Sequence, residues 1–145
     1  MPKMKQNEIE KGISTKKLLN KSFFKQKHRF LKFIKDGLYI SSLEVLSNAN
    51  LDLRSDKDVI LAAVTRNGYA LEYASVGLKN DKKVVLAAVK QNGHALQYVS
   101  EDIKDDKEVV LAALKESSSA LQYASDTLKN DKEVVMAAVK RIGGA

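Results

Sequence analysis

The sequence contains no cysteine, and its other scarce residues narrow the classes of protein to which it can belong. Without cysteine there is no disulfide, no thiol nucleophile and no cysteine-ligated zinc site. Only two histidines occur, His28 and His94, and a single proline and seven glycines leave long stretches free to be helical. No apolar run approaches the roughly 18 residues of a membrane span, and the N-terminal residues lack the apolar h-region typical of a secretory signal. We therefore expect a soluble, cytoplasmic, largely helical protein.

The charge is concentrated at one end. Residues 1–30 hold nine Lys or Arg and two Glu, whereas the remaining residues hold 16 basic and 16 acidic side chains. The net charge of +7 therefore belongs to an N-terminal arm, and an electrostatic argument for nucleic acid or membrane binding applies to that arm alone. With 44% hydrophobic residues, the neutral remainder is apolar enough for a packed core, which excludes disorder over the whole chain.

The remainder is an internal repeat. Three segments superimpose without a gap at steps of 25 residues, a fourth copy is partial, and a degenerate half-copy precedes them. They are residues 56–80, 81–105, 106–130, 131–145 and 43–55. Because a short helix is marginal alone in water, stacking of neighbours must stabilise it. We predict an all-α fold in which residues 38–145 form a small superhelical solenoid.

Each repeat is predicted to contain two short helices. The first would begin at an N-cap residue, Ser55, Asn80, Asp105 or Asn130, and carry the apolar block. Gly68 and Gly93 would end it in a left-handed conformation, and Ser118 in the same column predicts a strained or different turn in the third repeat. The second helix would carry the Ala-Leu-x-Tyr motif.

The segment before the repeats predicts an amphipathic basic helix over residues 13–37, after a mobile basic tail at 1–12. Phe23, Phe30 and Ile34 recur at helical spacing among Lys and Arg. The helix could bind an anionic surface, but burial of its apolar face as a cap on the first repeat is favoured.

Candidate catalytic residues are weak. Tyr73, Tyr98 and Tyr123 are best explained as core positions, and His94 has no partner at metal-ligand or general-base spacing. The recurring serines at 75, 100 and 125 lack a histidine base, and the Asp-Lys pairs suit helix starts. We expect no catalytic, metal-ligating or cofactor-binding residue.

Positions that differ between repeats are those that the fold leaves free. On the predicted second helix they recur at steps of three and four residues, opposite the core. Placed side by side, the three helices would form what we call the variable stripe: Tyr69, Glu72, Val76, His94, Gln97, Glu101, Ser119, Gln122 and Asp126. Solenoids use such faces for extended protein contacts, and a tyrosine is a favoured interface anchor.

The repeat motifs DK-x-VVLAAV, NG-x-AL-x-Y-A-S and LK-x-D resemble those of the domain of unknown function 4116 family over residues 56–145. A small chain of this kind also resembles bacterial effectors that bind and inhibit partner effectors of the ubiquitin-deamidase and transglutaminase type. The resemblance implies a protein partner of that type and action in a bacterial or host-cell cytoplasm. It supplies no catalytic motif.

Two functions therefore stand beside each other. The first is non-catalytic binding and inhibition of a partner enzyme through the variable stripe. The second is nucleic-acid or anionic-membrane binding through the basic helix. A homodimer or partner contact through apolar positions of the partial fourth repeat, around Val135, Val139 and Ile142, is a further expectation.

Overall fold

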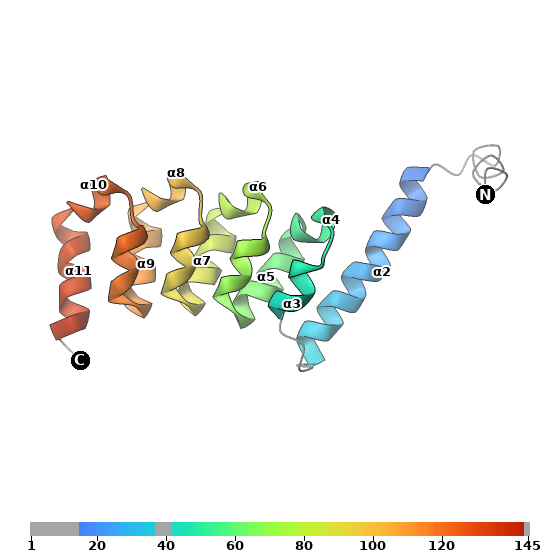
Figure 1. Ribbon diagram of the computed structural model, residues 1–145, viewed down its shortest axis with the longest axis horizontal. Coiled ribbons are helices and arrows are strands. Elements are labelled where there is room, and N and C mark those ends of the chain that lie inside the picture. The colour runs from blue at the N-terminus through green and yellow to red at the C-terminus, as the bar shows by residue number, and fades with distance from the viewer. Residues whose placement is uncertain (1–14, 37–41, 144–145) are drawn as a thin grey trace.

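The computed structural model describes residues 15–36 and 42–143, and every regular element in those ranges is helical (Figure 1). Three elements precede the full repeats: α2 (Thr15–Asp36), α3 (Ser42–Ser47) and α4 (Leu51–Arg54). The first repeat contains α5 (Lys57–Arg66), η1 (Gly68–Tyr73) and α6 (Val76–Lys79). The second contains α7 (Lys82–Gln91), η2 (Gly93–Tyr98) and α8 (Glu101–Lys104). The third contains α9 (Lys107–Glu116), η3 (Ser118–Tyr123) and α10 (Asp126–Lys129), and α11 (Lys132–Gly143) follows.

The predicted all-α solenoid is confirmed. Figure 1 shows α5, α7, α9 and α11 in one row, with the short helices α4, α6, α8 and α10 along one edge and α2 at the N-terminal end. Each long helix packs on the next, and the 3₁₀-helices η1, η2 and η3 pack on one another in the same order. The predicted tail at 1–12 and the end of the basic helix at Gly37 lie outside the described residues.

The repeat has three helices, so the prediction of two was wrong. The Ala-Leu-x-Tyr segment forms a six-residue 3₁₀-helix, and the chain then becomes extended at Ala74, with φ −67° and ψ 152°. Ser75 begins a new four-residue helix, since its Oγ accepts a hydrogen bond from the Leu78 N–H at 3.4 Å. Ser100 and Ser125 do the same in the next repeats, which explains why serine recurs in this column.

The long helices begin one residue later than predicted. Their N-caps are the aspartates of the Asp-Lys pairs: in α5, Asp56 accepts a hydrogen bond from the Val59 N–H at 3.1 Å. Asp81 and Asp106 cap α7 and α9 in the same way. The predicted helix-start role of the Asp-Lys pairs is therefore confirmed, with aspartate as the capping residue.

The glycines after the long helices are needed for space. Neither Gly68 nor Gly93 adopts a left-handed backbone, so the predicted left-handed cap was wrong. A Cβ at Gly68 would lie 2.6 Å from the carbonyl oxygen of Ala88, and one at Gly93 would lie 2.5 Å from that of Ala113. Glycine thus allows each 3₁₀-helix to approach the long helix of the next repeat.

The third turn is neither strained nor differently built, contrary to prediction. Ser117 has φ −151° and ψ 121°, close to −148° and 110° at Asn67 in the first repeat. What it loses is a hydrogen bond: Asn67 caps the Tyr69 N–H through its side chain, whereas Ser117 makes no side-chain cap.

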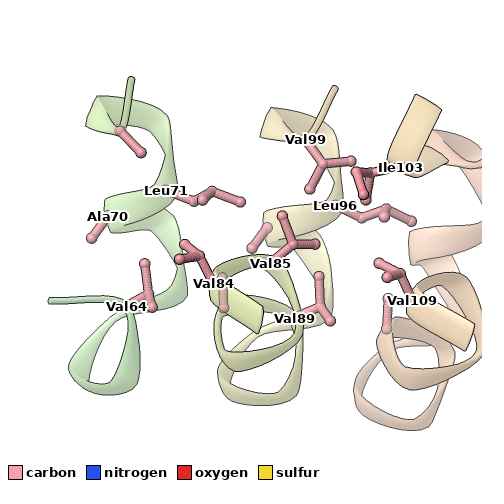
Figure 2. Close-up of a cluster of buried hydrophobic side chains, with 14 of the residues drawn as sticks. Val64, Ala70, Leu71, Val84, Val85, Val89, Leu96, Val99, Ile103 and Val109 are labelled. Atoms are coloured by element: carbon pink, nitrogen blue, oxygen red, sulfur yellow. The ribbon is translucent and has the colours of Figure 1, made fainter. Parts of the chain in front are cut away.

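The core runs continuously through the repeats. Leu71 projects from the first repeat toward the second, and Leu96 projects from the second toward the third (Figure 2). Both side chains are fully buried, as are the valines at 84, 85 and 89 around them. Small alanines at 63, 88 and 113 are also fully buried and let the long helices pack closely. No repeat buries its apolar residues alone.

The helix α2 caps the first repeat. Phe30 is 4% exposed, and Phe23 and Ile34 pack partly buried against the core. The Lys27 ammonium lies 2.9 Å from both Asp56 and Asp58 at the start of α5. The favoured capping role is therefore confirmed, and α2 takes the place of a preceding repeat.

The same ion pairs join the repeats along the solenoid. Lys57 pairs with Asp81 at 2.8 Å, Lys82 pairs with Asp106 at 2.9 Å, and Lys107 pairs with Asp131 at 3.1 Å. Glu108 and Glu133 add second contacts to the last two lysines, at 2.7 Å each. We call this series, begun by Lys27, the lysine–aspartate ladder.

The ladder shifts the ionisation of its members. The hydrogen bond from Lys57 is the main reason that the pKa of Asp81 is lowered from its usual value. The hydrogen bonds to Glu108 and Asp106 raise the pKa of Lys82. Both shifts favour the charged forms that make the pairs.

Candidate partner-binding surface

The variable stripe lies on two kinds of helix. Its first two positions in each repeat lie on a 3₁₀-helix, where residues three apart share one face. Its third position, at Val76, Glu101 or Asp126, is the first residue of the following short helix. The prediction that one helix carries all three positions was therefore wrong.

Exposure divides the stripe. Val76 is 82% exposed, an unusual value for an apolar side chain. Five polar members are also exposed: Glu72, Glu101, Ser119, Gln122 and Asp126. The remaining three, Tyr69, His94 and Gln97, are half-buried. The exposed part of the stripe is mildly acidic.

Two of the half-buried members, Tyr69 and His94, contact the following repeat. The Tyr69 and Tyr98 rings meet edge to face with centroids 6.3 Å apart, and His94 meets Tyr123 in the same way at 6.1 Å. Burial raises the pKa of the Tyr98 hydroxyl, and the negative charge of Glu72 adds to this shift. The recurring tyrosines at 73, 98 and 123 pack half-buried against the core, and the last two lie between it and the stripe residues that contact them.

The structure brings His94 together with two serines, which the sequence analysis missed. The His94 Nε2 lies 3.3 Å from the Oγ atoms of both Ser117 and Ser119, and those two oxygens are 2.8 Å apart. No carboxylate among the described residues is hydrogen-bonded to the imidazole, so the cluster lacks the third member of a catalytic triad. The available signal was the 25-residue offset of His94 from Ser119, which stacking turns into contact.

A shallow hollow borders the stripe in the third repeat. Ser119 and Gln122 line it together with Ser118, Leu121 and Lys129. Leu121 is half-buried, whereas Leu71 and Leu96 in the same column are fully buried, because each of those is covered by the next 3₁₀-helix. The stripe therefore reaches an accessible apolar side chain at this end.

The helix α11 presents apolar side chains to solvent. Val139 is 55% exposed and Ile142 is 69% exposed, as expected, whereas Val135 is half-buried. In the Val139 column, Val64 and Val89 are fully buried under the next long helix. Met136, which is 48% exposed, extends the patch.

The described residues include neither a metal-binding cluster nor a membrane-spanning helix. No group of three or more His, Cys, Asp or Glu side chains there is placed to hold a metal ion. No helix within 15–36 or 42–143 combines the length and the apolar character needed to cross a membrane.

The stacked three-helix units and their exposed variable positions define an all-α helical-repeat protein. The chain belongs to the family described as a domain of unknown function, DUF4116, whose model matches residues 24–79, 56–104 and 106–144. The first match begins inside α2 and includes residues 24–36 of the capping helix. Neither a search of the curated proteins nor one of the solved structures gave a match.

Proposed function

We propose that this protein is a non-catalytic binding module that attaches to a partner enzyme and inhibits it through the variable stripe. The observation that carries this proposal is a row of exposed and half-buried side chains that differ from repeat to repeat on a backbone that does not. The lysine–aspartate ladder and the buried core fix the spacing of the repeats. A rigid surface loses little entropy on binding, which favours affinity.

We further propose that the partner is an enzyme of the ubiquitin-deamidase or transglutaminase type, acting in a bacterial or host-cell cytoplasm. The support is the resemblance of the chain to small effectors that inhibit such enzymes. Inhibition would be steric, with the stripe covering the entrance to the partner's active site. No group of this chain needs to react.

The test is a binding and inhibition assay with a purified deamidase of that type. Replacing Tyr69 and His94 by alanine and Gln97 by lysine should weaken binding at least about tenfold, or about 1.4 kcal/mol. Because Tyr69 and His94 make ring contacts, circular dichroism must show that the variant keeps its fold.

A second variant avoids that complication. Glu72→Lys, Glu101→Lys and Asp126→Lys together change only exposed side chains of the same stripe. Loss of inhibition by both variants is the expected outcome. If both inhibit as strongly as the parent, the stripe is not the binding surface, and the patch around Val139 and Ile142 becomes the next candidate, including for a homodimer.

The alternative function is attachment to nucleic acid or an anionic membrane through α2. The observation in its favour is Phe24, which is 69% exposed on a helix that also exposes Lys25 and Arg29. Such binding should weaken steeply with salt, because it depends on released counterions. Affinity that does not change between low and physiological salt would exclude this alternative.

A further inference from the structure

A groove runs across the outer side of the long helices. It has a volume of about 670 Å³ and is lined by α7, α9 and α11. Its floor is apolar and half-buried: Leu86, Leu111, Ala112 and Ala137. Its basic rim consists of Lys90, Lys115, Lys140 and Arg141. We call this feature the outer groove.

The lysines of the rim lie in the last turn of each long helix, where a cation interacts favourably with the helix dipole. Lys90, Lys115 and Lys140 lie at steps of 25 residues, as Lys57, Lys82 and Lys107 of the ladder do. Lys82 and Lys107 each pair with acids of the next repeat, which explains their recurrence. Within the described ranges no ion pair is formed by any of the three rim lysines. The helix dipole therefore accounts for a cation at each helix end, but no ion pair within the described ranges neutralises the three charges, which leaves them available to an anionic occupant.

The series of rim lysines and the outer groove begin at the same helix. In the first repeat this column holds Thr65, and neither it nor Leu61 lines the groove. Both features start at α7 and include α9 and α11. The agreement links the charge to the hollow.

The charge of the outer groove is strongly one-sided. Glu108 is the single acid in the lining, and it is already held by Lys82 at 2.7 Å. Arg141 donates a hydrogen bond from its guanidinium to the Lys115 carbonyl, which places its charge over the end of α9. An apolar floor with unpaired cations along its edge complements an occupant with apolar side chains and carboxylates.

We propose that the outer groove binds an acidic amphipathic segment of a partner protein, lying across the long helices. Neighbouring helices pack roughly 8–10 Å apart, which sets the spacing of the rim lysines. Carboxylates seven residues apart on a helix, at about 1.5 Å per residue, match that spacing. A nucleic acid fits less well, because its phosphates would leave the apolar floor uncovered.

This surface is distinct from the variable stripe, which lies on other helices and has the opposite charge. The proposal does not depend on the proposed function, and the two can fail separately. A partner that used both surfaces would have to present basic or polar groups to one and acidic groups to the other.

The probe is a fluorescently labelled helical peptide with leucine on one side and glutamate at seven-residue spacing. Its binding to the full chain is followed by anisotropy. Lys90→Gln, Lys115→Gln and Lys140→Gln together should raise the Kd at least about tenfold. The matched control removes three exposed lysines outside the groove, by Lys83→Gln, Lys129→Gln and Lys132→Gln, and should leave the Kd within about twofold.

Two further arms separate the sources of affinity. A peptide with serine in place of leucine keeps its charge and should bind at least about tenfold more weakly, because the floor is then unused. A DNA duplex of equal charge should compete poorly. The stripe variant with Glu72→Lys, Glu101→Lys and Asp126→Lys should bind the peptide at least as well as the parent. This result separates the test of the outer groove from that of the proposed function.

The proposal is overturned by any of three results. One is equal weakening by the two lysine triples, which would indicate unspecific attraction. Another is stronger binding of the duplex than of the peptide. The third is no binding of the peptide up to about 1 mM.

Discussion

The two ends of the described solenoid carry similar columns in different surroundings. At the N-terminal end α5 is covered by α2 and by α7, and its Val64, in the column of Val139, is fully buried. At the other end α11 has no further helix beside it within the described residues, and Val139 is 55% exposed. The comparison teaches that a side chain of this repeat becomes core only through its neighbour.

The largest effect should follow removal of the cap. A chain without residues 1–35 loses the burial of Phe30 and the ion pairs of Lys27, and its first repeat faces water. Loss of a buried phenylalanine alone costs about 3–5 kcal/mol. We expect a lower Tm and binding of a dye specific for exposed apolar surface. An unchanged Tm would show that the two ends do not differ in the way described.

The second largest effect should come from shortening a buried apolar side chain, compared with an exposed one. Leu96→Ala removes a fully buried side chain between two repeats and should cost about 2–5 kcal/mol in denaturant unfolding. Val139→Ala, on the exposed end, is the control and should cost less than about 1 kcal/mol. Equal losses would contradict the assignment of inner and outer faces.

Replacing a glycine by alanine should have a smaller effect on stability, and a second glycine provides a matched control. Gly93→Ala places a methyl group 2.5 Å from the Ala113 carbonyl oxygen, so the repeats must move apart at a cost of about 1–3 kcal/mol. Gly77→Ala meets nothing within 4 Å and should be neutral or stabilise by about 0.4–1 kcal/mol. Chemical denaturation of both variants measures the difference. A stable Gly93→Ala protein would show that this contact is loose.

The smallest effect concerns pH. Because folding lowers the pKa of Asp81, its contribution to stability is present above the ordinary aspartate value of about 4 and is lost as the pH falls through the folded value. Folding raises the pKa of Lys82 and Lys107, so their contribution is present below about 10.4 and is lost as the pH rises further.

Thermal unfolding as a function of pH tests this assignment. Asp81→Asn should lower the free energy of unfolding at pH 7 by about 1 kcal/mol or less, since the pair is partly exposed. It should also make the loss of stability below pH 4 shallower than in the parent chain. If stability falls with pH in the same way in both proteins, the ionisation of Asp81 does not contribute to acid unfolding.

The sequence predicted the helical solenoid because near-identical segments must pack alike. The apolar columns, the cap and the exposed Val139 all followed from that register. The break before Ser75 was missed, since Ala-Leu-x-Tyr-Ala-Ser has the composition of one continuous helix. The role of Gly93 was misassigned because its cause is a carbonyl group in the next repeat, which local sequence does not reveal.

The candidate surfaces also differ in how far the sequence alone reveals them. Variation between repeats pointed to the stripe, but the cluster of His94 with Ser117 and Ser119 joins residues more than 20 positions apart and appears only on stacking. The outer groove was missed because its lysines recur like structural ones. The ion pairs of the folded chain separate ladder lysines such as Lys82 and Lys107, which acids neutralise, from the rim lysines, for which the described residues show no such pair.

Neighbouring repeats are joined by the same lysine–aspartate pair each time, and this has a consequence for how such a chain can change length. Each junction joins a lysine to the following aspartate, so loss or gain of one whole unit leaves matching partners on either side. Insertion of any other number of residues within a unit would separate lysine from aspartate and a glycine from the carbonyl that it faces. Near-identical stretches of the gene could thus recombine out of register and still encode a folded protein, lengthened or shortened by 25 residues.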